Sequence, residues 1–198
     1  MTSAARPWIA AIITSLLAAS PAWIYAGMTP WELKEFEEIK AGAEKGQPIS
    51  QAFYGVYYFA GSGVPKDQAQ AVLWFRKAAD QGHIGSQKML GMCYANGWGA
   101  AKNQAEAASW YRKAAEQGDT NAQISLGHIY NVGEGVTKDP VEAYAYWNLA
   151  GITDEGARRN LTRLESLISA DQIAAGKKRT LELRKEIEAK IAAKKAGK

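Results

Sequence analysis

The residue types that most often carry chemistry are scarce in this sequence of 198 residues. Its only histidines are His83 and His128, and its only cysteine is Cys93. His83 falls in an expected loop and His128 in an expected helix, without the His-x-x-x-His spacing that places two metal ligands on one helical face. A single cysteine allows neither an intramolecular disulfide nor a cysteine-based metal site. The sequence therefore predicts no metal site and no cofactor.

Motifs of nucleophilic and acid–base catalysis are also missing from the sequence. Neither Gly-x-Ser-x-Gly nor Ser-x-x-Lys occurs, so acyl-transfer chemistry has no support. The acidic pairs Glu37–Glu38 and Asp154–Glu155 fall in expected helices. Adjacent residues of a helix point about 100° apart, so neither pair can face itself across a cleft. We therefore expect a protein that is not an enzyme.

A glycine-rich loop, GSGVPKD at 61–67, has the composition of a phosphate-binding loop, and it recurs as GWGAAKN at 97–103 and GEGVTKD at 133–139. None of the copies fits Gly-x-x-x-x-Gly-Lys-Ser/Thr or Gly-x-Gly-x-x-Gly. Each instead places a glycine where a helix would end and an Asp or Asn where the next would begin, with Gln or Glu three residues later. We interpret the loop as a turn between two helices. Its lysines are then expected in solvent: Lys66, Lys102 and Lys138.

These loops belong to a repeat with a period of 36 residues. The three copies are Ser50–Gly82, Ser86–Gly118 and Ala122–Gly151. Half a copy precedes them, since Ala43 and Gly46 lie one period before Ala79 and Gly82. Such a half-copy would supply an orphan second helix that covers the N-terminal end of the array.

Each copy predicts two helices. Tyr54 and Tyr58 lie on one face of the first helix. Gly55 lies beside this face and recurs as Gly91 and Gly127. A mid-helix glycine costs about 1 kcal/mol relative to alanine, so we expect a neighbouring helix to come too close for a side chain. In the second helix, small residues and an indole recur at fixed positions, and the indole is expected to fill the wedge between repeats: Ala71, Trp74 and Ala78.

The fold class that follows is all-α, a short α-solenoid over 31–151 with C-terminal capping helices and a basic tail over 152–198. The segment 176–198 holds nine Lys or Arg and three Glu, so the net charge of +4 belongs to the tail. This tail has no aromatic residue, which argues against a nucleic-acid partner. We expect a solvated helix with a frayed lysine-rich end, and contact with a membrane surface through the tail is the alternative.

The first 26 residues match a secretory signal. Arg6 precedes an apolar run over Trp8–Ala19, and small residues follow up to Ala26. We predict a signal peptide over 1–26, cleaved after Ala26, and a secreted or periplasmic protein of a bacterial envelope. The alternative is a membrane anchor over 7–26, although Pro21 interrupts that stretch.

The third copy, AQISLGHIYNVGEGVTKDPVEAYAYWNLAG, resembles the Sel-one-like repeat (SLR), a relative of the tetratricopeptide repeat. The resemblance covers Phe36 to Gly151, and LISADQIAAGKKR resembles the short helix that often closes bacterial members. Departures from the family pattern are Tyr54 for leucine, Ala100 for valine and Tyr146 for tryptophan. The resemblance implies an α-solenoid that binds other proteins and usually does no chemistry.

In the tetratricopeptide relatives, the first helices of successive repeats line a concave face. The equivalent positions here share one face of each helix. They are Ala52, Val56, Phe59 and Ala60, then Lys88, Met92, Ala95 and Asn96, then Ile124, His128, Asn131 and Val132. We expect them to bind an apolar helix or extended segment of another protein. The alternative is that these residues pack against neighbouring helices or against the C-terminal segment folding back.

The function that these expectations support is that of an exported adaptor or scaffold with a protein or peptide partner. The residues expected to matter most for binding are Val56, Phe59, Lys88, Met92, Ile124, His128 and Asn131. The alternative function is an accessory subunit of a cell-envelope enzyme or of a peptidoglycan-related process.

Overall fold

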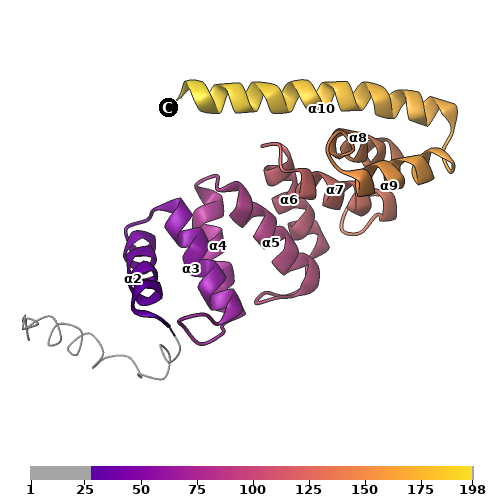
Figure 1. The fold of residues 1–198 in the computed structure, drawn as a ribbon. Helices are drawn as coiled ribbons and strands as arrows, with labels where there is room; N and C mark the ends of the chain where they lie inside the picture. Colours follow the sequence, from indigo (N-terminus) through magenta and orange to yellow (C-terminus); the bar gives the residue numbers. More distant parts are fainter. Residues whose placement is uncertain (1–27, 198) are drawn as a thin grey trace, which may run out of the picture.

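The structure, a computed structural model, describes residues 28–197, and the predicted signal peptide lies outside them. The described part is helical without strands, and successive helices stack side by side (Figure 1). The helices are α2 (Pro30–Glu44), α3 (Pro48–Ala60), α4 (Gln68–Asp80), α5 (Ile84–Asn96), α6 (Gln104–Ala115), α7 (Thr120–Val132), α8 (Pro140–Ala150), α9 (Glu155–Glu165) and α10 (Ala170–Ala196). The prediction of a short all-α solenoid is confirmed. α3–α4, α5–α6 and α7–α8 are the three repeats, and α2 is the orphan second helix.

The glycine-rich loops are helix turns, as predicted. The glycine that ends each first helix is left-handed, with φ between 76° and 85°: Gly61, Gly97 and Gly133. The side chain that begins each second helix accepts a hydrogen bond from the backbone N–H three residues later, at 3.0 to 3.1 Å: Asp67, Asn103 and Asp139. The three loop lysines are exposed: Lys66, Lys102 and Lys138.

Only half of the expected capping box forms in these loops. In a full box, the Glu106 side chain would accept from the Asn103 N–H. That N–H instead donates to the Tyr94 carbonyl at 2.9 Å, which ties the loop back to the preceding helix. Glu106 accepts from the Trp110 indole N–H at 3.0 Å. The corresponding N–H groups of Asp67 and Asp139 likewise donate to tyrosine carbonyls, so the Gln or Glu side chain three residues on is free for other contacts.

The second glycine of each loop lets successive repeats approach. Gly99 has a φ of 72°, and a Cβ built there would lie 2.0 Å from the Gln68 carbonyl oxygen of the preceding repeat. A Cβ on Gly135 would lie 2.4 Å from the Ala105 backbone nitrogen. The sequence predicted a chain reversal here, and the structure adds a backbone contact between repeats.

The glycine within each first helix is where its partner helix crosses, as predicted. A Cβ on Gly55 or Gly91 would lie 2.7 Å from the ring of Phe75 or Tyr111. On Gly127 it would lie 2.4 Å from the Trp147 indole. The aromatic ring that packs against the glycine belongs to the residue after the position of Trp74, where the sequence predicted an indole. Trp110, at that expected position, is buried between the first and second repeats in a cluster with Phe75, Leu90 and Cys93.

Buried glutamines join the repeats with hydrogen bonds. Gln87, 5% exposed, donates to the Ala79 carbonyl of the preceding repeat at 3.1 Å and accepts from Gln117 of its own repeat at 2.7 Å. One period earlier, Gln51 donates to Ala43 and accepts from Gln81 in the same way. Because each buried amide needs a partner in the neighbouring repeat, these bonds fix how the repeats stack.

Helix α10 occupies the place of a fourth repeat. In the first two repeats an arginine of the second helix donates to a tyrosine hydroxyl of the next repeat: Arg76 to Tyr94 and Arg112 to Tyr130. In the third repeat this position is Asn148, whose amide donates to Thr180 of α10 at 3.2 Å. A Cβ on Gly176 of α10 would lie 2.6 Å from the Tyr144 ring, so α10 repeats the glycine-to-ring contact.

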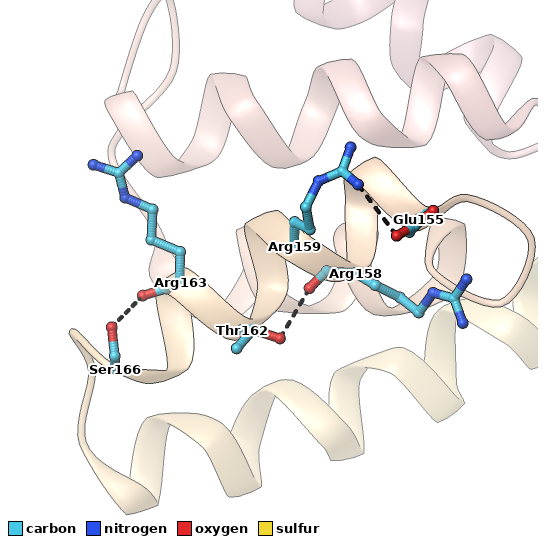
Figure 2. Close-up of a pocket in the computed structure, with 6 residues that line it drawn as sticks. All are labelled: Glu155, Arg158, Arg159, Thr162, Arg163 and Ser166. Carbon is cyan, nitrogen blue, oxygen red and sulfur yellow. Dashed lines mark hydrogen bonds and ion pairs between the residues drawn. The ribbon is translucent and has the colours of Figure 1, made fainter.

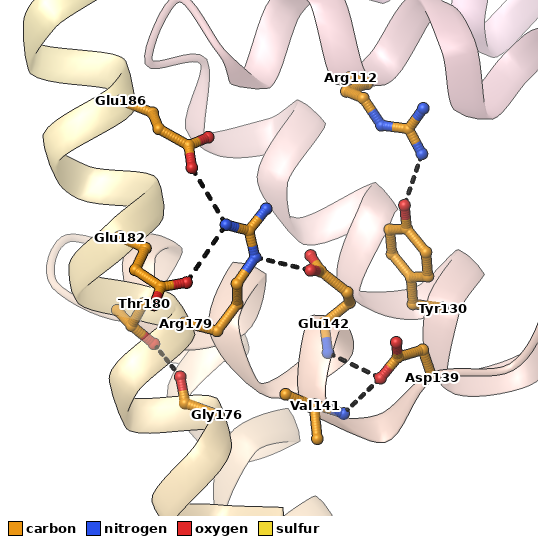
Figure 3. Close-up of polar contacts among 10 residues, drawn as sticks. All are labelled: Arg112, Tyr130, Asp139, Val141, Glu142, Gly176, Arg179, Thr180, Glu182 and Glu186. Carbon is orange, nitrogen blue, oxygen red and sulfur yellow. Dashed lines mark hydrogen bonds and ion pairs between the residues drawn. The ribbon is translucent and has the colours of Figure 1, made fainter.

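One arginine joins α10 to the third repeat. Arg179 Nε donates to Glu142 of α8 at 2.6 Å, and its Nη1 reaches both Glu186 at 3.1 Å and Glu182 at 3.6 Å (Figure 3). Glu142 follows the Asp139 cap, in the half of the capping box that does not form. Glu142, whose carboxylate is not used in a capping box, therefore holds α10 through Arg179.

The far half of α10 crosses the turns between repeats. Lys190 pairs with Glu116 at 2.7 Å, and Lys194 donates to Gln117 at 2.5 Å and to the Gly82 carbonyl at 3.4 Å. The frayed end expected from the sequence is thus helical to Ala196. Within residues 28–197, no helix has the length and apolarity that crossing a membrane requires.

We predict that Gly91→Ala lowers the free energy of unfolding by about 1–3 kcal/mol, since the new methyl group meets the Tyr111 ring. In a Tyr111→Ala background the same change should be neutral or stabilising by up to about 1 kcal/mol, because alanine is the better helix former. Urea unfolding followed by circular dichroism measures both. An equal loss in the two backgrounds would show that the ring does not set the need for glycine.

Candidate protein-binding face

Three large apolar side chains lie exposed along one face of α3. Ile49, Phe53 and Val56 follow i, i+4 and i+7 spacing, and 62%, 55% and 46% of their surfaces are exposed. The opposite face of α3 is buried through Tyr54 and Gly55. Contiguous apolar residues on a surface are typical of sites that bind other molecules.

A hollow of about 240 Å³ lies next to this face. Its lining combines apolar groups of α3 and α4 with the first turns of α5: Ala52, Phe53, Val56, Phe75, His83, Gly85, Ser86, Lys88 and Met89. Methionine adapts its shape to varied partners, so Met89 suits a surface that receives an apolar side chain.

The apolar character of this face declines along the solenoid. One period after Ile49, Phe53 and Val56, the same positions of α5 hold Gly85, Met89 and Met92. Two periods after, the positions of α7 are polar, and two of the three are exposed: Asn121, Ser125 and His128. The surface available to an apolar partner is therefore concentrated on α3.

The structure brings together some of the residues predicted from the sequence and separates others. Val56 and Lys88 line the same hollow, together with Ala52. Phe59 lies elsewhere, because its ring packs at 5.7 Å from Trp98 and 6.4 Å from Phe75, in the contact between repeats. Met92 is half-buried and packs against the core cluster that contains Tyr111 and Ile129.

The remaining predicted residues lie on α5 and α7. Lys88 pairs with Asp119, the N-cap of α7, at 3.4 Å, so its charge is already partly neutralised. The Ile124 carbonyl accepts from the Trp147 indole N–H at 3.2 Å. His128 is exposed and Asn131 half-buried. Phe59 and Met92 thus pack against neighbouring helices, as the alternative interpretation expected. Val56 and His128 instead face solvent.

Ile49 and Phe53 were missed by the sequence reasoning. The predicted stripe began at Ala52 and followed the register of the tetratricopeptide relatives. Stepping back from Val56 by three and seven residues would have found both, since these spacings stay on one helical face. The period also aligns Phe53 with Met89, a second apolar residue at that position.

A larger hollow of about 660 Å³ lies along α9. All its lining residues come from that one helix and its C-cap Ser166, and Figure 2 shows Arg158 and Arg163 extending in different directions. Arg159 pairs with Glu155 at 3.3 Å, and Thr162 donates to a backbone carbonyl of its own helix at 3.1 Å. This is an open polar helix surface on which no two elements converge.

The candidates for chemistry are apart and structurally engaged. His83 caps α5, where its Nδ1 accepts from the Ser86 N–H at 3.1 Å, and burial, assisted by Lys194, lowers the pKa of its ring. His128 lies on α7. No group of three potential metal ligands occurs among residues 28–197. Cys93 is fully buried, and burial raises the pKa of its thiol to about 11.

Stacked two-helix units, closed by a terminal helix and presenting an exposed apolar face, define a repeat protein of the α-solenoid class. The family model of the Sel1 repeat matches residues 48–83, 85–119 and 120–151, just over half of the chain. The chain belongs to the Sel1 repeat family, as its resemblance to the SLR pattern predicted. Sel1 repeats are protein–protein interaction modules and are typically non-catalytic scaffolds.

Solved structures of similar proteins agree with this assignment. A Sel1 repeat protein from Oxalobacter formigenes is 33% identical with a TM-score of 0.64, over 74% of this chain and 63% of that chain. The SLR protein c5321, described as a protective antigen present in uropathogenic Escherichia coli strains, is 29% identical with a TM-score of 0.59, over 82% and 43%. This chain therefore spans less than two thirds of either protein.

The fold is also shared with cysteine rich protein B of Helicobacter pylori. That protein is 22% identical with a TM-score of 0.53, over 65% of this chain and 96% of that chain. At this identity the likeness concerns the fold alone. No curated protein sequence matches the chain.

We predict that Cys93 resists thiol reagents in the folded protein. At about pH 8, a thiol with a pKa near 11 is ionised in only about one molecule in a thousand, and burial also blocks access. Labelling with a chromogenic disulfide should be slow in buffer and fast in concentrated urea. As a control, Ser109→Cys in a Cys93→Ala background places an exposed thiol on α6 that should react at once. Equally fast labelling of Cys93 in buffer would contradict its burial.

Proposed function

We propose that this protein is an exported adaptor whose α3 face holds an apolar segment of a partner protein. The observation that carries the proposal is the exposed row of Ile49, Phe53 and Val56 beside the hollow between α3 and α5. Sel1 repeats bind other proteins, and on this face three large apolar side chains are left in solvent in one row.

The apolar side chains and the hollow of this face indicate what kind of segment would bind there. An amphipathic helix with anchors at i, i+3 or i+4, and i+7 would lay its apolar side along α3. The hollow of about 240 Å³ corresponds to several water molecules at about 30 Å³ each, which leaves room for a large anchoring side chain. Phe53 contributes the aromatic surface that typically dominates such contacts.

The polar end of the face would receive the polar end of the partner. His128 and Asn131 on α7 offer hydrogen bonds, and Lys88 lies between the two ends. In this arrangement the first helices α3, α5 and α7 form the concave face inferred from tetratricopeptide relatives. Phe59 supports the surface from beneath rather than touching the partner, since its ring packs against Trp98 of the next repeat.

We predict that Phe53→Asp and Val56→Asp each weaken capture of the partner strongly while helicity is unchanged. A charge at a buried anchor commonly costs 2 kcal/mol or more, about a thirtyfold loss of affinity. The measurement is a cross-linking pull-down from the native envelope with mass spectrometry, followed by calorimetry with a peptide of the captured protein.

The matched control is Leu73→Asp on α4, where an apolar side chain is 53% exposed away from this face. It should leave capture intact. Loss of capture in the control as well, or undiminished capture by both α3 variants, would overturn the proposed site.

The proposed location is secreted or periplasmic, supported by the signal-like sequence of residues 1–26. We predict that the mature protein from that fraction begins at Gly27, as intact-mass spectrometry would show. A full-length mass found in the membrane fraction would favour the anchor over 7–26 instead.

A further inference from the structure

The outer face of α10 carries an unusual concentration of positive charge. Lys177, Lys178, Arg184 and Lys185 are all exposed around Leu181, which is itself 57% exposed. Their spacing of i, i+1, i+7 and i+8 places them along one side of about two and a half turns. An isolated leucine among four cations on a helix surface is an arrangement that packing within the fold does not require.

The carboxylates of α10 do not balance these cations. Glu182 and Glu186 are drawn to Arg179, on the flank of α10 that meets α8 (Figure 3). Arg179 is shared further with Glu142, so the acidic groups belong to the junction with the third repeat. The remaining carboxylates of α10, Asp171 and Glu188, are exposed before and after the cationic row and offset two of its charges at most.

The fold holds this face outward. Thr180, Leu183 and Ile187 are buried on the inner side of α10, and Gly176 contacts the Tyr144 ring. Rotating the cations inward would expose the apolar side chains of Leu183 and Ile187. Figure 1 shows α10 as one straight helix along the edge of the solenoid, and among residues 28–197 no other helix covers its outer face.

We propose that this cationic face of α10 binds the surface of an anionic phospholipid membrane. Each Lys or Arg near such a surface strengthens binding by about fivefold, and salt screens the effect. The long cationic side chains reach the headgroups while Leu181 enters the interface between them. A convex helix side fits a flat membrane better than a shaped protein pocket, and the absence of aromatic residues from 176–198 disfavours nucleic acid.

The proposed membrane contact is separate from the α3 face. It rests on α10, whereas the partner-binding proposal rests on residues of α3 and α5. Because the two surfaces lie on different elements, a membrane-bound molecule would keep its α3 face available. The protein would then present a partner at a membrane surface without a spanning helix among residues 28–197.

The test is co-sedimentation of the full chain with vesicles of phosphatidylglycerol and phosphatidylcholine, compared with vesicles of phosphatidylcholine alone. We expect binding to the anionic vesicles that weakens as salt is raised. Lys178→Glu combined with Lys185→Glu should reduce it by tenfold or more, and Leu181→Ala should reduce it by a smaller factor. Any contribution of residues 1–27, which include Arg6, is the same in every variant, so the differences between variants report the α10 side chains alone.

The matched control is Lys66→Glu combined with Lys102→Glu, which makes the same charge change at two exposed loop lysines. It should retain most of the binding, and circular dichroism should show all variants folded. An equal loss of vesicle binding in this control would show that only the net charge matters, and it would overturn the proposal. Equal binding to neutral vesicles would also overturn it, as would binding to polyglutamate with none to anionic vesicles, which would indicate an acidic protein.

Discussion

The contact between a glycine of each first helix and an aromatic ring of the second is the constraint on which the solenoid depends. A Cβ on Gly55, Gly91 or Gly127 would fall within 2.7 Å of that ring. The absent side chain allows the two helices of a repeat to cross closely, and the ring fills the space between them. Since every repeat uses the same contact, every helix pair has the same geometry, and the first helices all present the same outer face. The exposed row on α3 exists because Gly55 has buried the other side of that helix.

Close packing alone does not determine how one repeat stacks on the next, and here buried polar groups contribute. Gln87 bonds to a carbonyl of the preceding repeat and to Gln117 of its own. A shift of one repeat against the next would leave these amides unpaired, at a cost of about 1–3 kcal/mol each. Among residues 28–197, no buried side-chain nitrogen or oxygen lacks a hydrogen-bond partner. These hydrogen bonds between repeats therefore fix a single register of stacking, which apolar contacts alone would define less sharply.

Most of the fold could be predicted from the sequence because the period repeats each local signal three times. Loop glycines, N-caps and the mid-helix glycine are local features, and all appear as expected. The glutamine bonds and the role of Asn148 could not be predicted, because they depend on which side chains meet between repeats. The candidate site was predicted only in part for the same reason. Val56 was found, but Phe59 turns into the contact with Trp98, and Phe53 lies one residue outside the register taken from relatives.

The length of helix α10 matches the length of the repeat array that it closes. Its 27 residues span about 40 Å, and along this length it meets α8, the turn at Gly118 and the turn at Gly82. Duplication of one 36-residue unit would add helices that the same α10 could no longer cross. A single deletion in α10 would rotate Leu183 and Ile187 away from the repeats by about 100°. The length of α10 and the direction of its buried face must therefore match the number of repeats. A variant of this chain with an added repeat would need a compensating change in its C-terminal helix.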